Sequence, residues 1–199
     1  MTAISTTDQH ADSHFVIDAL ERYKDELPFA REHLALHYSC WQALHQCQGK
    51  SDAAVDAWRA ALSRRWECEI VARRLYKQVF RQYLEQYGGA DHLVIHSLAT
   101  RRDTSVATPP ELLADLRSLH ADLGLNTGAA NAARSEQILV TCANLDEAIR
   151  ETATREAARR AAVLDRRVAQ EAIQHAHTTT KHALASCPTA PLELANLFV

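Results

Sequence analysis

Residues 156–173, EAARRAAVLDRRVAQEAI, give the clearest indication of the fold class of this chain. This stretch is rich in Ala, and its apolar residues are spaced as on one side of an α-helix. The helical pattern extends in both directions, from about Ser135 to Ser186, where Cys187-Pro188 ends it. Small residues on its apolar side would let a second helix axis approach closely. The sequence therefore predicts one long C-terminal helix over residues 135–186.

The N-terminal half carries a second helical pattern. Its apolar residues alternate between spacings of four and three, at Val16, Leu20, Tyr23, Leu27, Ala30, Leu34, Trp41 and Leu44. His37 fills the position that this series skips, which predicts a core histidine, while Pro28 predicts a kink or a restart of the helix. Another pattern runs from the N-cap candidate Ser51 to Gly88-Gly89. The short link Gly49-Lys50 then predicts an antiparallel hairpin over residues 14–88.

A third helix has the clearest local start. Thr108-Pro109-Pro110-Glu111 is a capping box with proline at the first helical position, and leucines follow at helical spacing, which predicts a helix over residues 109–123.

With 47% hydrophobic and 24% charged residues but only 5 Gly and 5 Pro, the chain lacks the turn residues that many short strands need. We therefore predict an all-α fold, an antiparallel helical bundle in a single domain over residues 14–187. A disordered tail, 1–13, precedes it, and a second tail, 188–199, follows it.

The predicted helix lengths suggest a function. The C-terminal helix would reach roughly 75 to 80 Å, against roughly 50 to 55 Å for each arm of the hairpin. Such a helix protrudes, breaks or pairs with another chain. This favours a non-enzymatic interaction or scaffold protein that acts through self-association, as a coiled-coil homo-oligomer, or through a partner helix groove.

Two His-x3-His pairs offer an alternative function. His33 and His37 form one pair, His92 and His96 the other, and residues four apart share one helix face. Two such pairs on facing helices would provide four imidazole ligands for a transition metal or haem. The Glu-x2-His pattern of carboxylate-bridged di-iron bundles is absent from the sequence. A structural role remains open, since chance pairs are common in a chain with 11 histidines.

A basic stripe offers a weaker alternative. Arg73, Lys77 and Arg81 share one helix face and alternate with the aromatic residues Tyr76 and Phe80. Such a stripe would bind phosphates while the aromatic rings stack on bases. In the other interpretation the aromatic rings face the core and the basic residues form its solvated rim. The net charge of −3 favours this second interpretation and argues against a nucleic-acid partner.

The sequence gives no positive support for an enzyme. It contains no nucleophile elbow and no Gly-rich phosphate loop, and its five cysteines include no Cys-x2-Cys pair, so we expect small buried thiols. No signal peptide and no stretch of membrane-spanning length and hydropathy is evident. These features predict a cytoplasmic protein with no membrane partner.

Overall fold

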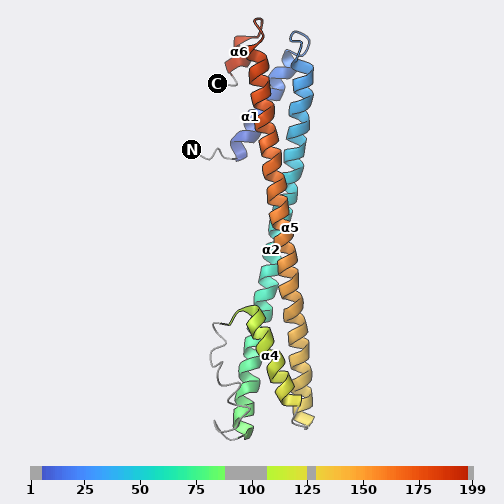
Figure 1. The fold of residues 1–199 in the computed structure, drawn as a ribbon, viewed down its shortest axis with the longest axis vertical. Helices are drawn as coiled ribbons and strands as arrows, with labels where there is room; N and C mark the ends of the chain where they lie inside the picture. Colours follow the sequence, from blue (N-terminus) through green and yellow to red (C-terminus); the bar gives the residue numbers. More distant parts are fainter. Residues whose placement is uncertain (1–5, 88–106, 125–128, 197–199) are drawn as a thin grey trace. The chain divides into compact units, whose positions relative to one another are not determined.

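The computed structural model describes residues 6–87, 107–124 and 129–196, and over these ranges the chain is helical and contains no strand (Figure 1). The helices are α1 (Thr6–Arg22), α2 (Ala30–Tyr87), α4 (Pro109–Gly124), α5 (Ala129–Ala185) and α6 (Leu192–Asn196). The all-α prediction is confirmed. The predicted helices 109–123 and 135–186 correspond to α4 and α5, and α5 is unbroken.

The first turn of the chain lies earlier than the sequence indicates. α1 ends at Arg22, the chain turns through residues 23–29, and α2 begins at Ala30, so Pro28 separates two helices. The prediction of a hairpin that turns at Gly49-Lys50 is wrong. Residues 6–13, predicted as disordered, are the first part of α1, and α6 lies within the predicted C-terminal tail.

α2 continues through Gly49 because nothing at that position opposes a helix. A Cβ built on Gly49 meets no atom within 4 Å, and one Gly in a helix costs only about 1 kcal/mol relative to Ala. The Ser51 side chain, the expected N-cap, is buried in the helix interface instead. α2 therefore has 58 residues and α5 has 57. The excess length predicted for the C-terminal helix does not exist.

The chain separates into two compact units, each described by itself below. Unit 1 comprises Met1–Val55 and Ala158–Val199, and unit 2 comprises Asp56–Ala157. α2 and α5 contribute residues to both. The prediction that residues 14–187 form a single domain stays a prediction.

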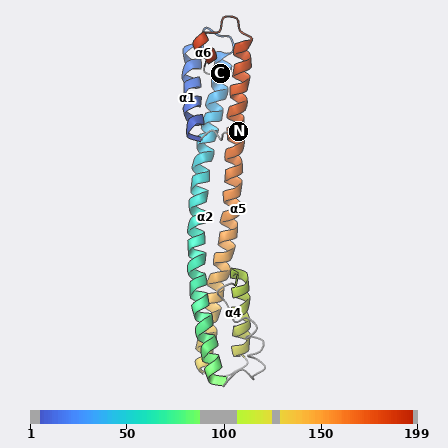
Figure 2. The same ribbon diagram turned by 90° about the vertical axis from the view of Figure 1, so that its left-hand side faces the viewer.

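Unit 2 is built around the leucines of α4. This helix lies beside α2 and α5 (Figure 2), and a single apolar cluster joins the three helices. Its buried members are Ala72, Leu75, Tyr76 and Val79 from α2, Leu112, Leu113, Leu116, Leu119 and Leu123 from α4, and Ile138, Cys142 and Leu145 from α5. Spacings of three and four along α4 place these leucines on one face, so their burial stabilises the whole unit.

Unit 1 contains two apolar clusters. The first joins α1, the turn, α2, α5 and α6 through Val16, Leu20, Leu27, Ala30, Leu184 and Leu194. The second is smaller and joins α2 to α5 through Leu44, Ala169 and Ile173. The first cluster anchors α6, because Leu194 is fully buried in it.

The capping box of α4 gives a first testable prediction. The amide and the hydroxyl of Thr108 both donate to Glu111 Oε2, at 2.7 and 2.8 Å. We expect Thr108→Ala to lower the unfolding free energy by about 1 kcal/mol, measured by urea denaturation, because the helix loses its N-cap side chain. The control is Thr154→Ala, which removes a mid-helix hydroxyl bonded to the Arg150 carbonyl at 3.0 Å and should have little effect. Equal losses in both variants would contradict the prediction.

Candidate functional site

Two histidines of α2 meet one threonine of α5 inside unit 1. His33 Nδ1 lies 2.8 Å and His37 Nε2 lies 2.9 Å from the Oγ1 atom of Thr180. The side chains are buried, with 8%, 2% and 0% of their residue surfaces exposed, respectively. The i,i+4 spacing of the histidines places both rings on the α2 face that packs on α5. The prediction that His37 is a core histidine is confirmed, and His33 is buried beside it.

The hydrogen bonds around Thr180 indicate which atoms of this cluster donate and which accept. Its hydroxyl also lies 2.9 Å from the carbonyl of Ala176, and a carbonyl can only accept. All three contacts are satisfied only if the hydroxyl donates to Ala176 and both imidazoles donate to the hydroxyl. His33 Nδ1 and His37 Nε2 then each carry a hydrogen, which in neutral rings corresponds to the Nδ1–H tautomer of His33 and the Nε2–H tautomer of His37.

A third histidine completes what we call the histidine layer, the set His33, His37, His177 and Thr180. The His177 ring, on α5, packs edge-on against His37 with ring centroids 5.0 Å apart. Burial, together with the neighbouring His177 and His33, lowers the pKa of His37 to about 4. Burial also lowers the pKa of His33, although Glu32 opposes this effect. The environment therefore favours the neutral form of both rings.

The histidine layer interrupts the apolar contact between α2 and α5. On one side lies the cluster that contains Ala30 and Leu184, and on the other side lies the cluster of Leu44. Between the layer and Leu44, the Cys40 Sγ atom lies 3.8 Å from the Ala172 carbonyl. Burial raises the pKa of the Cys40 thiol, which makes it a poor nucleophile.

The geometry of the layer does not match a metal site. Within the described ranges, no group of three or more His, Cys, Asp or Glu side chains could hold a metal ion. The two imidazoles face a hydroxyl instead. His92 and His96 lie outside the described residues, so the four-histidine metal or haem site stays a prediction. No sequence motif points to Thr180, which only the pairing of α2 with α5 brings to the histidines.

Arg73, the first residue of the basic stripe in unit 2, already contacts polar groups of the protein itself. Arg73 donates to the carbonyl of Ala107 at 2.7 Å and lies 3.6 Å from Glu69. Tyr76 is buried and stacks on Phe80, with ring centroids 5.9 Å apart, as the interpretation with core-facing rings predicts. Tyr76 is therefore not available to stack on a base. Lys77 and Arg81 are exposed, and their role in anion binding stays a prediction.

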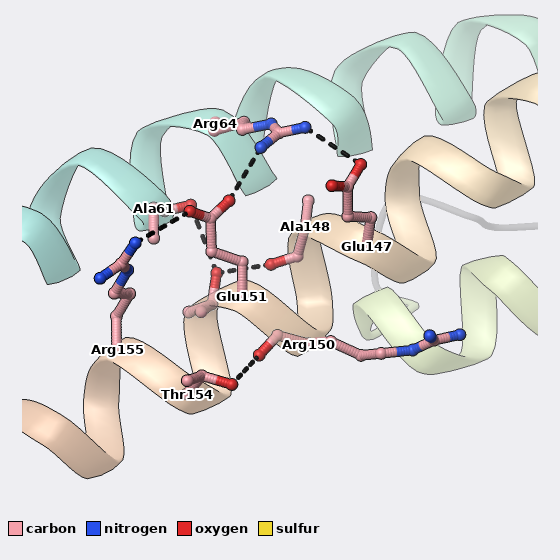
Figure 3. Close-up of polar contacts among 9 residues, drawn as sticks. Ala61, Arg64, Glu147, Ala148, Arg150, Glu151, Thr154 and Arg155 are labelled. Carbon is pink, nitrogen blue, oxygen red and sulfur yellow. Dashed lines mark hydrogen bonds and ion pairs between the residues drawn. The ribbon is translucent and has the colours of Figure 1, made fainter.

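Ion pairs also connect α2 to α5 within unit 2. Arg64 on α2 bridges Glu151 at 2.9 Å and Glu147 at 3.2 Å, both on α5 (Figure 3). Beside this bridge, the Thr152 hydroxyl donates to the Ala148 carbonyl at 2.8 Å. These acidic groups are neutralised by an arginine at a partly exposed helix interface, where such pairs contribute little to stability. They orient the two helices and do not form a catalytic pair.

A groove of about 260 Å³ lies between α1 and α6. It is lined by Phe15, Asp18, Ala19, Arg22, Tyr23, Glu193 and Leu194. This volume is below the range typical of small-molecule sites, and the Tyr23 hydroxyl approaches Glu193 across it at 3.5 Å.

Comparison with known proteins finds no match to a family model, to a curated protein or to a solved structure. Among the helices described, none is long and apolar enough to cross a lipid bilayer.

Proposed function

We propose that this protein is a non-enzymatic helical interaction protein that associates with a second copy of itself through α5. The observation that carries the proposal is an exposed apolar strip on α5 within unit 1. Leu164 and Val168 lie one helical turn apart and are 60% and 57% exposed. Ala161 and Ala172, on either side of them, are exposed as well, and we call these four residues the α5 strip.

The spacing and residue types of Ala161, Leu164 and Val168 fit a parallel two-stranded contact. With Ala161 at heptad position a, Leu164 occupies d and Val168 the next a. Ala172, by contrast, falls at position e, next to Glu171 at the following d. A β-branched residue at a with leucine at d favours two parallel strands. Small residues on either side allow close approach of the two helix axes.

Charges beside the α5 strip favour the same arrangement. Arg160 occupies position g and Asp165 the following e position, and both side chains are exposed. In a parallel pair, position g of one helix lies next to position e of its partner, which brings these opposite charges together twice. An antiparallel pair would instead place Arg167 of each copy together at g positions, which disfavours it. A second copy is therefore the occupant that these residues favour.

Sedimentation velocity over a micromolar concentration series tests the proposal. We expect reversible dimerisation, and we expect Leu164→Lys with Val168→Lys to weaken it by more than about tenfold, because two charges enter the contact. The matched control is Leu139→Lys, a substitution of a leucine that is 52% exposed on α5 within unit 2 and should leave association unchanged. A wild-type chain that stays monomeric at all concentrations, or equal weakening in both variants, would refute the proposal.

A further inference from the structure

We propose that the histidine layer of unit 1 is a pH-sensitive contact, which stabilises the packing of α2 on α5 at neutral pH and weakens it as the pH falls. The proposal is independent of the self-association described above. It concerns the inner contact between α2 and α5, whereas the α5 strip is on the exposed surface.

The layer offers no counter-charge to a protonated ring. Within the described part of the chain, the partners of His33 are Thr180 and the ring of Phe29, and those of His37 are Thr180 and His177. None of these partners is a carboxylate. A second proton on either imidazole would create a buried positive charge with no negative group in contact, which is strongly unfavourable.

The surrounding charges increase this effect. From α5, His177 faces His37 and disfavours a second positive charge beside it. From α2 itself, His33 acts on His37 in the same direction, and Glu32 is the one group that favours protonation of His33. Among the described residues, no charged side chain of α1 or α6 contributes to the pKa shift of either ring. Acid therefore places like charges close together in a buried layer.

The sign of the pH dependence follows from the lowered pKa values. Below the ordinary histidine pKa of 6.5, the opened state binds protons that the closed state excludes. The contribution of the layer is complete above pH 6.5 and is lost as the pH falls towards 4. For His37 alone, the ratio of opened to closed molecules should rise about 100-fold between neutral pH and pH 4.

At acid pH, we expect the packing of the helices to loosen first in unit 1. The layer lies next to the cluster that anchors α1 and α6, since Ala30 and Leu184 belong to that cluster and lie one turn from His33 and Thr180 on their helices. Loss of contact at the layer therefore weakens the attachment of both short helices.

Hydrogen exchange measured by mass spectrometry on the full chain tests the proposed pH dependence. After correction for the intrinsic pH dependence of exchange, amides of α1 and α6 should exchange faster between pH 6.5 and pH 4, with α4 of unit 2 as internal reference. In His33→Leu with His37→Leu this acceleration should disappear, because the Thr180 hydroxyl keeps its bond to Ala176 and no buried ring remains to be protonated. The control His175→Gln, at an exposed position of α5, should behave like the wild type.

Nitrogen NMR of the wild-type imidazoles provides a second measurement that does not require the double variant to fold. We expect the Nδ1–H tautomer for His33, the Nε2–H tautomer for His37, a pKa below 6.5 for His33 and a pKa of about 4 for His37. Ordinary titration of His33 and His37 near pH 6.5 would overturn the proposal. An unchanged acid response in a folded double variant would overturn it as well.

Discussion

Replacing Leu116 with alanine is expected to lower the unfolding free energy by about 2 to 5 kcal/mol. Leu116 is 0% exposed and lies in the middle of the α4 face that packs on α2 and α5 in unit 2. The substitution removes apolar contact and leaves a cavity in a cluster held by three helices, which cannot easily close around it. Urea denaturation followed by circular dichroism should show the loss in the transition that includes unit 2.

A matched substitution separates burial from side-chain size. Leu139 is 52% exposed on α5 in the same unit, so Leu139→Ala removes the same atoms from a position in contact with water. We expect a change of less than about 0.5 kcal/mol there. A comparable loss at both positions would show that α4 does not pack on α2 and α5 as described.

Replacing Thr180 with valine is the second substitution with a large expected effect. Valine has nearly the shape of threonine but offers no acceptor, so the N–H groups of His33 and His37 would remain buried without partners. At about 1 to 3 kcal/mol for each unsatisfied donor, the expected loss of unfolding free energy at neutral pH is about 2 to 5 kcal/mol. Thermal and urea denaturation both measure this loss.

Two further variants identify the hydroxyl as the cause. Thr180→Ser keeps the acceptor and should recover most of the stability. Thr178→Val removes an exposed hydroxyl that donates to the Gln174 carbonyl at 2.9 Å, and should change stability by less than about 0.5 kcal/mol. If serine and valine at position 180 are equally destabilising, the hydroxyl is not the acceptor for the two histidines.

The parts of the fold that the sequence predicts well depend on local chemistry. The start of α4 follows from the capping box at Thr108 and Glu111, and both hydrogen bonds to Glu111 are present. The length of α5 follows from its uninterrupted helical pattern, which ends beside Pro188. These signals lie within a few residues of the features that they predict.

The turns were harder to predict because tertiary packing outweighs local signals. Leu27 is buried although it lies in the turn, so the apolar series passes through the true break without interruption. Gly49 resembles a stop signal, but its small helix penalty is offset by packing along α2. Placing the hairpin turn there shortened the N-terminal helices and made the C-terminal helix appear too long.

In the candidate site too, local patterns predict some features and tertiary packing determines others. The position of His37 in the apolar series correctly predicted a core histidine. Its partner Thr180 lies 143 residues away, in a run of three threonines that sequence reasoning treats as a weak helix end. Single-sequence patterns assign a residue to a helix face, but they do not determine which residue of another helix lies opposite.

The histidine layer also has a consequence for register. On the buried face of α5 in unit 1, Ala169 and Ala176 are small and do little to fix the alignment with α2. A slide of one turn would move Thr180 away from His33 and His37 and leave their buried donors unpaired. A polar pair within a coiled coil can specify a single alignment in this way, at some expense of stability. Within unit 1, one hydroxyl therefore favours the native alignment of α2 and α5 over an alignment shifted by one turn.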